Sequence, residues 1–209
     1  VSVFIDPAGA NTTAAATVIA ANRHISFKTP ARSKAYHALV LGGTGPVGQR
    51  VSRLLANQGI HVHLVSRSFE RASQHCKLLS KEFSFAHFEP TSIKMIEKVI
   101  GTVDLIVSAG RPGVEMLTEA QLSQAISSTV CIDLNAVPPA GITGIQATDT
   151  ARQDGTKILY GALGIGEIKM KLHKTAIQRL FQTNDQWLDA EQLLTIGEDI
   201  DVSNEQISQ

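Results

Sequence analysis

The sequence predicts an α/β protein with a doubly wound, Rossmann-type parallel sheet. From residue 37 to residue 135, short apolar runs of strand length alternate with amphipathic runs of helix length, which is typical of βαβ units with right-handed crossovers. Within this region the stretch VLGGTGPVGQR, residues 40–50, places glycines between the first of these strands and the first helix. Such folds bind dinucleotides at a glycine-rich turn in this position.

Each element is expected from its own pattern, in chain order. Residues 1–5 form a short strand, and Asn11 caps a helix that alanine-rich residues continue to residue 22. A linker of mixed polarity follows over residues 23–36. The alternating strands are expected at residues 37–41, 60–67, 83–89, 103–110 and 129–135. The helices between them are expected at residues 47–59, 68–83, 92–101 and 118–127.

In the last third of the chain, the alternation of strand-length and helix-length runs is less regular. Residues 163–166, LGIG, are expected to form a glycine turn before a helix over residues 169–181. A second amphipathic helix is expected over residues 188–200, and the polar residues 201–209 are expected to form a tail.

The composition excludes several classes of partner. The 209 residues contain 19 Lys and Arg against 19 Asp and Glu, so no overall positive charge attracts nucleic acid or an anionic membrane. No apolar run reaches the roughly 18 residues that a membrane span needs. Cys76 and Cys131 lie in different expected elements, without metal-ligand spacing. We therefore expect a cytoplasmic protein with no nucleic-acid, membrane or metal partner.

The glycine turn has the residue types that a pyrophosphate site needs. Gly43 allows a tight turn, Gly45 allows the backbone to approach the pyrophosphate, and Gly48 allows close packing of helix on strand. Pro46 suits the first turn of a helix, where an amide has no intrahelical partner. The cofactor contacts predicted here are Gly43, Thr44, Gly45, Pro46, Val47 and Gly48. A structural turn without a ligand is the alternative.

The end of the second alternating strand favours NADP over NAD as the cofactor. NAD enzymes usually hold the ribose with an Asp or Glu about 20 residues past the glycines. This strand instead ends in Ser66 and Arg67. The Arg67 guanidinium can pair with a 2′-phosphate, which a carboxylate would repel; a solvated surface arginine is the alternative. Further cofactor contacts are predicted where the next strands end, at Ser108, Ala109, Gly110 and Asn135.

Longer motifs carry a resemblance to a known family. DPAGANTTAAATV (6–18), VLGGTGPVGQR, DLNAVPPAGITGIQATD (133–149) and GALGIGEIKMKLHK (161–174) together resemble the NADP-dependent methylene-tetrahydromethanopterin dehydrogenases of C1-metabolising bacteria. The resemblance implies an oxidoreductase that transfers a hydride from methylene-tetrahydromethanopterin, a pterin-type C1 carrier, to NADP and leaves the methenyl form. It also implies a homo-oligomer.

The resemblance further implies a division of the chain. In this family a substrate-binding lobe precedes the nucleotide domain, and the pterin lies in the cleft between them. Residues 1–30 would then be a remnant of that lobe with its hinge helix, residues 31–182 the NADP-binding Rossmann domain, and residues 183–209 a C-terminal helix and polar tail. Either the sequence is part of a longer protein or it is a shortened relative.

The resemblance also implies which residues lie at the pterin end of the site. Lys169 and Lys171 match family lysines and are the predicted catalytic residues; two positions apart on a helix, they point to different faces, so we expect one to enter the cleft. Asp6 and Asn11 are predicted to bind substrate from the opposite wall. Glu167 stands where the family usually has glycine and places a negative charge beside the cleft.

Two other functions stay open at this point, a methylene-tetrahydrofolate dehydrogenase and a non-catalytic NADP-binding protein. Hydride transfer that leaves a delocalised methenyl cation needs no proton acceptor and no covalent intermediate, so positioning and electrostatics suffice. His61 and His63 share one face of a strand, and we interpret them, with His75, His87 and His173, as surface or packing residues.

Overall fold

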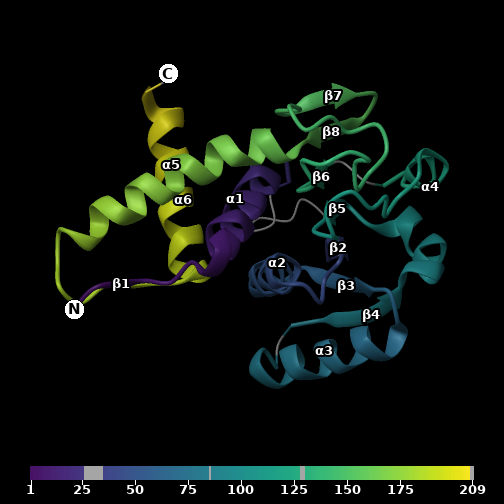
Figure 1. Ribbon diagram of the computed structural model, residues 1–209, viewed down its shortest axis with the longest axis horizontal. Coiled ribbons are helices and arrows are strands. Elements are labelled where there is room, and N and C mark those ends of the chain that lie inside the picture. The colour runs from purple at the N-terminus through teal and green to yellow at the C-terminus, as the bar shows by residue number, and fades with distance from the viewer. Residues whose placement is uncertain (26–34, 85, 128–129, 208–209) are drawn as a thin grey trace.

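The structure is a computed structural model that describes residues 1–25, 35–84, 86–127 and 130–207 (Figure 1). The strands are β1 (Val3–Phe4), β2 (His37–Leu41), β3 (His61–Ser66), β4 (Phe88–Ser92), β5 (Leu105–Ser108), β6 (Val130–Asp133), β7 (Arg152–Asp154), β8 (Lys157–Tyr160) and β9 (Trp187–Leu188). The α-helices are α1 (Ala10–Asn22), α2 (Pro46–Asn57), α3 (Phe69–Glu82), α4 (Glu119–Ser123), α5 (Ala162–Leu180) and α6 (Ala190–Ile207). The 3-10 helices are η1 (Pro7–Gly9), η2 (Ile93–Lys98) and η3 (Ile100–Thr102).

The central sheet has the topology of a doubly wound fold. Within the described residues, seven strands pair in the order β4-β3-β2-β5-β6-β8-β7, and only β7 runs antiparallel to its neighbour. Leu41 pairs with Val65 of β3 on one side and with Ser108 of β5 on the other. The chain therefore leaves β2 and β5 in opposite directions, and this divergence opens a ligand crevice at the carboxyl edge of the sheet. The predicted Rossmann-type fold is confirmed.

Alternating apolar residues build a core on each face of the sheet. Ala38 and Val40 contribute to the core that α1, α2, α5 and α6 cover, whereas Leu39 and Leu41 contribute to the core under η2 and η3. Figure 1 shows α1, α5 and α6 on one side of the strands and α4 on the other. Because both faces are covered, the central strands are apolar on both sides, as parallel strands usually are.

Helix α1 is buried on nearly all sides. Its residues Ala14, Ala15 and Ala16 are 0% exposed, since small side chains allow α2, α5 and α6 to pack closely around it. Strand β1, just before it, pairs in parallel with β9, so the start of the chain lies beside the segment that precedes α6 (Figure 1). This packing brings the amino end of α1 next to α5.

Helix α5 begins earlier than the sequence predicts. Residues 163–166 lie inside the helix, which begins at Ala162 after Gly161 as N-cap, so the predicted glycine turn is wrong. A Cβ atom on Gly164 would collide with the carbonyl oxygen of Asp149. The glycine therefore allows the helix to approach the preceding loop, rather than bending the backbone.

Other differences concern boundaries and the edge of the sheet. The helix predicted over residues 92–101 is η2 followed by η3, and residues 201–207 continue α6 instead of forming a tail. Strand β4 begins at Phe88, later than predicted, and β7, β8 and β9 have no counterpart among the predicted strands. Most of the predicted linker and the predicted boundary after residue 30 lie outside the described residues.

Candidate functional site

The glycine turn between β2 and α2 has little room for side chains. Gly42 has a φ of +69°, and a Cβ there would lie 2.7 Å from both the carbonyl oxygen of Ala109 and the Cα of Gly110. A Cβ on Gly48 would lie 2.8 Å from the Cα of Gly43 and still closer to the Gly42 carbonyl oxygen. Gly48 therefore has the predicted role of close packing, while the left-handed residue of the turn is Gly42 rather than Gly43.

The start of α2 is arranged as an anion site. Gly45 is the N-cap and Pro46 occupies the first turn, as predicted for a residue whose amide would have no intrahelical partner. The Gln49 side chain donates to the Thr44 carbonyl at 2.7 Å, and this hydrogen bond helps to hold the turn in its conformation. The remaining free amides at a helix N-terminus favour a bound anion such as a pyrophosphate.

A cleft of about 320 Å³ lies in front of this turn at the carboxyl edge of the sheet. Its lining combines small residues of the turn and of the loop after β5 with cationic side chains: Gly42, Thr44, Gly45, Ser66, Arg67, Arg71, Ala109, Gly110, Arg111, Val114 and Met116. Six of the predicted cofactor contacts line this cleft together with three arginines: Thr44, Gly45, Ser66, Arg67, Ala109 and Gly110. This concentration of guanidinium groups suits a ligand with several phosphates.

The buried hydroxyls of the cleft connect β3 to the glycine turn. Thr44 Oγ1 lies 3.4 Å from Ser66 Oγ, and both residues are less than a tenth exposed. Arg67 follows Ser66 and is exposed, and Arg71 stands one turn into α3, where its backbone amide donates to the Ser68 hydroxyl. Ser68 is the N-cap of α3, so its hydrogen bond to the Arg71 amide fixes the position of Arg71 at the start of the helix.

The residues at the end of β6 serve mainly to shape a loop. Asp133 is 1% exposed, and its carboxylate accepts from the amides of Gly141 at 2.6 Å, Ile142 at 3.1 Å and Asn135 at 3.1 Å. Burial raises the pKa of Asp133 although these amides act in the opposite direction. The Asn135 side chain donates to the Pro139 carbonyl and accepts from the Val137 amide. Cofactor contact by Asn135 stays a prediction.

Asp6 holds the amino end of α1. Its Oδ1 accepts from the amides of Asn11 at 2.9 Å and Thr12 at 3.1 Å, and its Oδ2 accepts from the Thr12 hydroxyl at 2.7 Å. The carboxylate therefore satisfies amides of the first helical turn that have no intrahelical partner. Direct contact of Asp6 with substrate stays a prediction.

Asn11 connects this loop to the cofactor turn. Its Nδ2 donates to the Ile5 carbonyl, and its Oδ1 accepts from Nε of Arg50 on α2. Arg50 also donates through Nη1 to the Pro46 carbonyl at 2.7 Å. Asn11 is 3% exposed, and its side chain lies between the loop before α1 and helix α2. The predicted substrate wall and the pyrophosphate turn are thus physically joined.

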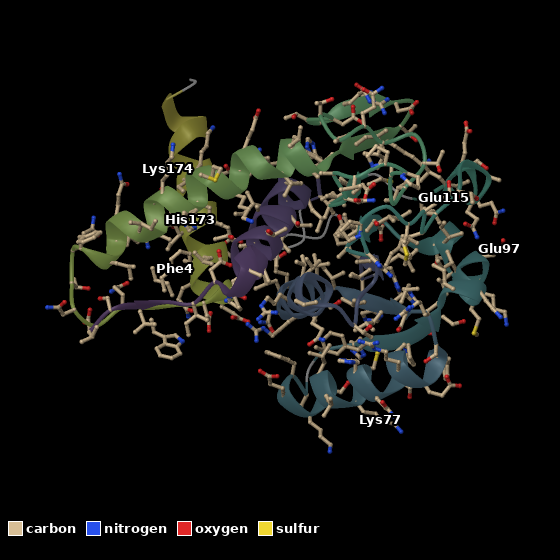
Figure 2. The ribbon with its side chains drawn as sticks, viewed as in Figure 1. Phe4, Lys77, Glu97, Glu115, His173 and Lys174 are labelled. Carbon is tan, nitrogen blue, oxygen red and sulfur yellow. The ribbon has the colours of Figure 1, made fainter. Side chains whose placement is uncertain are left out.

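The two lysines of α5 have different surroundings. Lys169 is half-buried and lies against the loop before α1, because a Cβ on Gly9 would be 2.5 Å from Lys169 Nζ. Lys171 and Glu167 are exposed on other faces of α5. One turn further, His173 packs against Phe4 with ring centroids 5.3 Å apart and the ring planes tilted by 54° (Figure 2). Of the two candidates, Lys169 is the one next to the predicted substrate wall.

The residues of the site that the sequence did not predict include four with a glycine or arginine role: Gly42, Arg50, Arg71 and Arg111. Three of them had a local signal. Arg71 is a cation in the first turn of the helix after Arg67, and Arg111 directly follows the predicted Gly110. Gly42 precedes Gly43, and two adjacent glycines leave open which one takes the left-handed conformation. Arg50 had none, because its partner Asn11 is 39 positions away.

Neither cysteine belongs to the site. Cys76 and Cys131 are free and buried, and burial raises the pKa of each thiol to about 12. Both are therefore protonated at neutral pH and are poor nucleophiles. Among the described residues, no helix combines the length and apolar character that crossing a bilayer requires.

The parallel sheet, the glycine turn at its switch point and the arginine-lined cleft define a Rossmann-type dinucleotide-binding protein of the dehydrogenase class. Residues 17–152 match the sequence pattern of the family "Shikimate / quinate 5-dehydrogenase". Over 203 residues the chain is 35% identical to the "Bifunctional protein MdtA" of Methylorubrum extorquens, covering 96% of this chain and 69% of that protein. Over 188 residues it is 31% identical to the "NAD(P)-dependent methylenetetrahydromethanopterin dehydrogenase" of the same organism, covering 88% of this chain and 63% of that protein.

The chain belongs to the family of the bifunctional protein MdtA and, through residues 17–152, to the shikimate / quinate 5-dehydrogenase family. It spans about two thirds of the length of these two relatives. Among solved structures, the transhydrogenase of Sinorhizobium meliloti shares the fold with a TM-score of 0.61 at 17% identity, covering 94% of this chain and 54% of that one. Quinate dehydrogenase of Corynebacterium glutamicum in complex with NAD has a TM-score of 0.54 at 14% identity, covering 90% of this chain and 61% of that one.

Proposed function

We propose that this chain transfers a hydride from methylene-tetrahydromethanopterin to NADP and leaves methenyl-tetrahydromethanopterin. One observation carries the proposal: three arginines line a cleft at the glycine turn, in a chain that shares its family with a methylenetetrahydromethanopterin dehydrogenase. The substrate follows from the family, and the choice of NADP follows from the cleft. Among the described residues, no Asp or Glu lines this cleft, so no carboxylate there would repel a 2′-phosphate.

The residues around the cleft fit a dinucleotide phosphate. Gly42 and Gly45 line the cleft without side chains where a pyrophosphate would approach, and the start of α2 supplies free amides. Arg67 and Arg71, beyond Ser66, would hold the 2′-phosphate through charge-assisted hydrogen bonds. When bound, the nicotinamide supplies the hydride acceptor. The chain's own part is to orient the two reactants and to exclude water from the space between them.

The substrate side would be built from the loop before α1 and from α5. Asp6 and Asn11 keep this loop in a fixed shape, and Lys169 lies directly against it. Loss of a hydride makes the pterin positive, so the residues of this wall must tolerate a developing cation. Arg50 keeps this wall at a fixed place relative to the cofactor turn.

A direct assay tests the function. Purified protein mixed with NADP and methylene-tetrahydromethanopterin should produce NADPH, measured by its absorbance, with methenyl product in equal amount. Methylene-tetrahydrofolate and NAD serve as comparison substrates and should react more slowly. Activity only with the folate carrier would contradict the choice of substrate, and NADP binding without turnover of either carrier would support a binding protein instead.

Lys169→Met should lower kcat/KM for the pterin by about ten-fold or more, because the half-buried ammonium lies at the predicted substrate wall. Lys171→Met should have a smaller effect, since Lys171 is exposed on another face of α5. Lys174→Met, on the same helix and exposed (Figure 2), is the matched control for loss of one charge. Steady-state kinetics with fixed NADP measure all three; equal values for Lys169→Met and Lys174→Met would remove Lys169 from the site.

We further propose a cytoplasmic homo-oligomer in which residues 1–30 belong to the substrate-binding lobe, residues 31–182 to the NADP-binding domain and residues 183–209 to a C-terminal extension. The packing of α1 between α2, α5 and α6 supports a close association of the first of these parts with the rest. Light scattering coupled to gel filtration measures the oligomeric state, and a monomer at micromolar concentration would contradict this part of the proposal.

A further inference from the structure

Histidines from three neighbouring strands meet at the amino edge of the sheet, opposite the edge that holds the cofactor cleft. His37 and His61 are the first residues of β2 and β3 and are register partners. His87 lies just before β4, and its carbonyl accepts from the Val62 amide. The ring centroids of His37 and His61 are 4.9 Å apart, and those of His61 and His87 are 4.3 Å apart.

A fourth histidine completes the group. His63 is 5% exposed, and its Nε2 lies 3.4 Å from Nδ1 of His37. The other ring nitrogen of His63, Nδ1, lies 3.4 Å from Oε2 of Glu89 on β4. One nitrogen of His63 thus faces a second imidazole while the other faces a carboxylate.

The spacing of the two facing nitrogens matches a shared metal ion. A zinc ion bonds imidazole nitrogen at about 2.0–2.1 Å in tetrahedral geometry, which places two such nitrogens roughly 3.3–3.4 Å apart. A carboxylate on the far nitrogen of a ligating histidine is the usual way of fixing its ring. The pair His37 and His63, with Glu89 behind His63, has both features.

We propose that His37, His63 and His61 bind one divalent transition-metal ion of the zinc class, with Glu89 as the carboxylate that orients His63. In the part of the chain that the structure describes, no three such side chains yet surround a common point, so the His61 ring must turn to join the pair. His61 is partly exposed and borders a cavity of about 380 Å³, which leaves room for this rotation and for a water ligand.

The ion would cross-link two neighbouring strands. It would join the first residue of β2 to two residues of β3, at the end of the sheet remote from the cofactor cleft. Because it binds the folded chain and not the unfolded one, it should raise the melting temperature, and the stabilisation grows with the logarithm of the free ion concentration divided by Kd. The cross-link is independent of the proposed hydride transfer, so either can fail without the other.

Calorimetric titration of the metal-stripped chain, prepared without a histidine tag, tests the site. Zinc chloride and nickel chloride should each bind with one ion per chain, whereas magnesium chloride, which prefers oxygen ligands, should not bind. The melting temperature, measured by differential scanning fluorimetry, should rise with zinc. Absence of zinc binding by the wild-type chain would overturn the proposal.

Variants locate the ion. His37→Gln and His61→Gln should each weaken zinc binding by more than ten-fold, and Glu89→Gln by about ten-fold, the usual loss for an orienting carboxylate. His173→Gln, remote on α5, is the matched control and should bind as the wild type does. His63 is buried, so its substitution is avoided; circular dichroism confirms that the other variants fold. Wild-type affinity in either His37→Gln or His61→Gln would overturn the three-histidine site.

Discussion

Gly42→Ala is expected to weaken NADP binding by more than ten-fold and to destabilise the fold by about 2–4 kcal/mol. Two causes act together. The residue has a φ of +69°, which an L side chain adopts only with strain, and the new Cβ would lie 2.7 Å from backbone atoms of Ala109 and Gly110. Relief of the collision must separate the turn after β2 from the loop after β5, and both line the cleft.

Gly59→Ala separates these two causes. Gly59 also has a positive φ, +80°, but a Cβ there meets nothing within 4 Å. This control should cost only the backbone strain, about 1–2 kcal/mol, and should leave NADP affinity unchanged. Urea unfolding measures stability and calorimetry measures affinity. If Gly42→Ala bound NADP as tightly as Gly59→Ala, the turn would not hold the cofactor.

The double variant Arg67→Ala, Arg71→Ala is expected to reduce affinity for NADP by about 10- to 100-fold while leaving affinity for NAD nearly unchanged. A charge-assisted hydrogen bond contributes about 1.5–3 kcal/mol, and every 1.4 kcal/mol is a factor of ten. Both side chains border the cleft, and the Ser68 cap uses only the backbone of Arg71, so truncation leaves the helix start intact. Calorimetric titration with each dinucleotide measures the selectivity.

Lys77→Ala is the matched control for this change of charge. Lys77 is exposed on the same helix as Arg71 and outside the cleft (Figure 2). Its removal should alter the affinity for NADP less than two-fold, because exposed charges more than about 10 Å apart are largely screened at physiological salt. An equal loss for NADP and NAD in the double variant would show that the arginines hold the pyrophosphate rather than the 2′-phosphate.

The sequence predicted the fold well where local pattern decides it. Strands β2, β3, β5 and β6 have runs of apolar residues bounded by polar or glycine positions, and each lies within or near its predicted range. Arg67 and the residues after β5 could be predicted to lie at the cleft because each directly follows a parallel strand, and the carboxyl ends of these strands share one edge of the sheet. These predictions depend on residues close together in sequence.

The sequence failed where distant residues decide. The glycines of α5 suggested a turn, but Gly164 lies inside the helix. A glycine is needed there because the Asp149 carbonyl leaves no room for a Cβ. The predicted cap by Asn11 is wrong, because Gly9 is the N-cap of α1 and Asn11 lies in its first turn, where Arg50 holds its side chain. His61 and His63 were interpreted as surface or packing residues; His63 is buried, and only the pairing of β2, β3 and β4 shows that four imidazoles meet.

The pairing of β1 with β9 has a consequence for the order of events during synthesis. The Ser2 hydroxyl bonds the carbonyl of Thr183, a separation of 181 residues, so the first strand leaves the ribosome long before its partner exists. The sheet from β2 to β8 needs neither of these strands and can assemble while the chain is still growing. Helix α1, apolar on nearly all sides, must wait for α5 and α6. Until those helices have been made, the buried faces of α1 stay exposed to water on the growing chain.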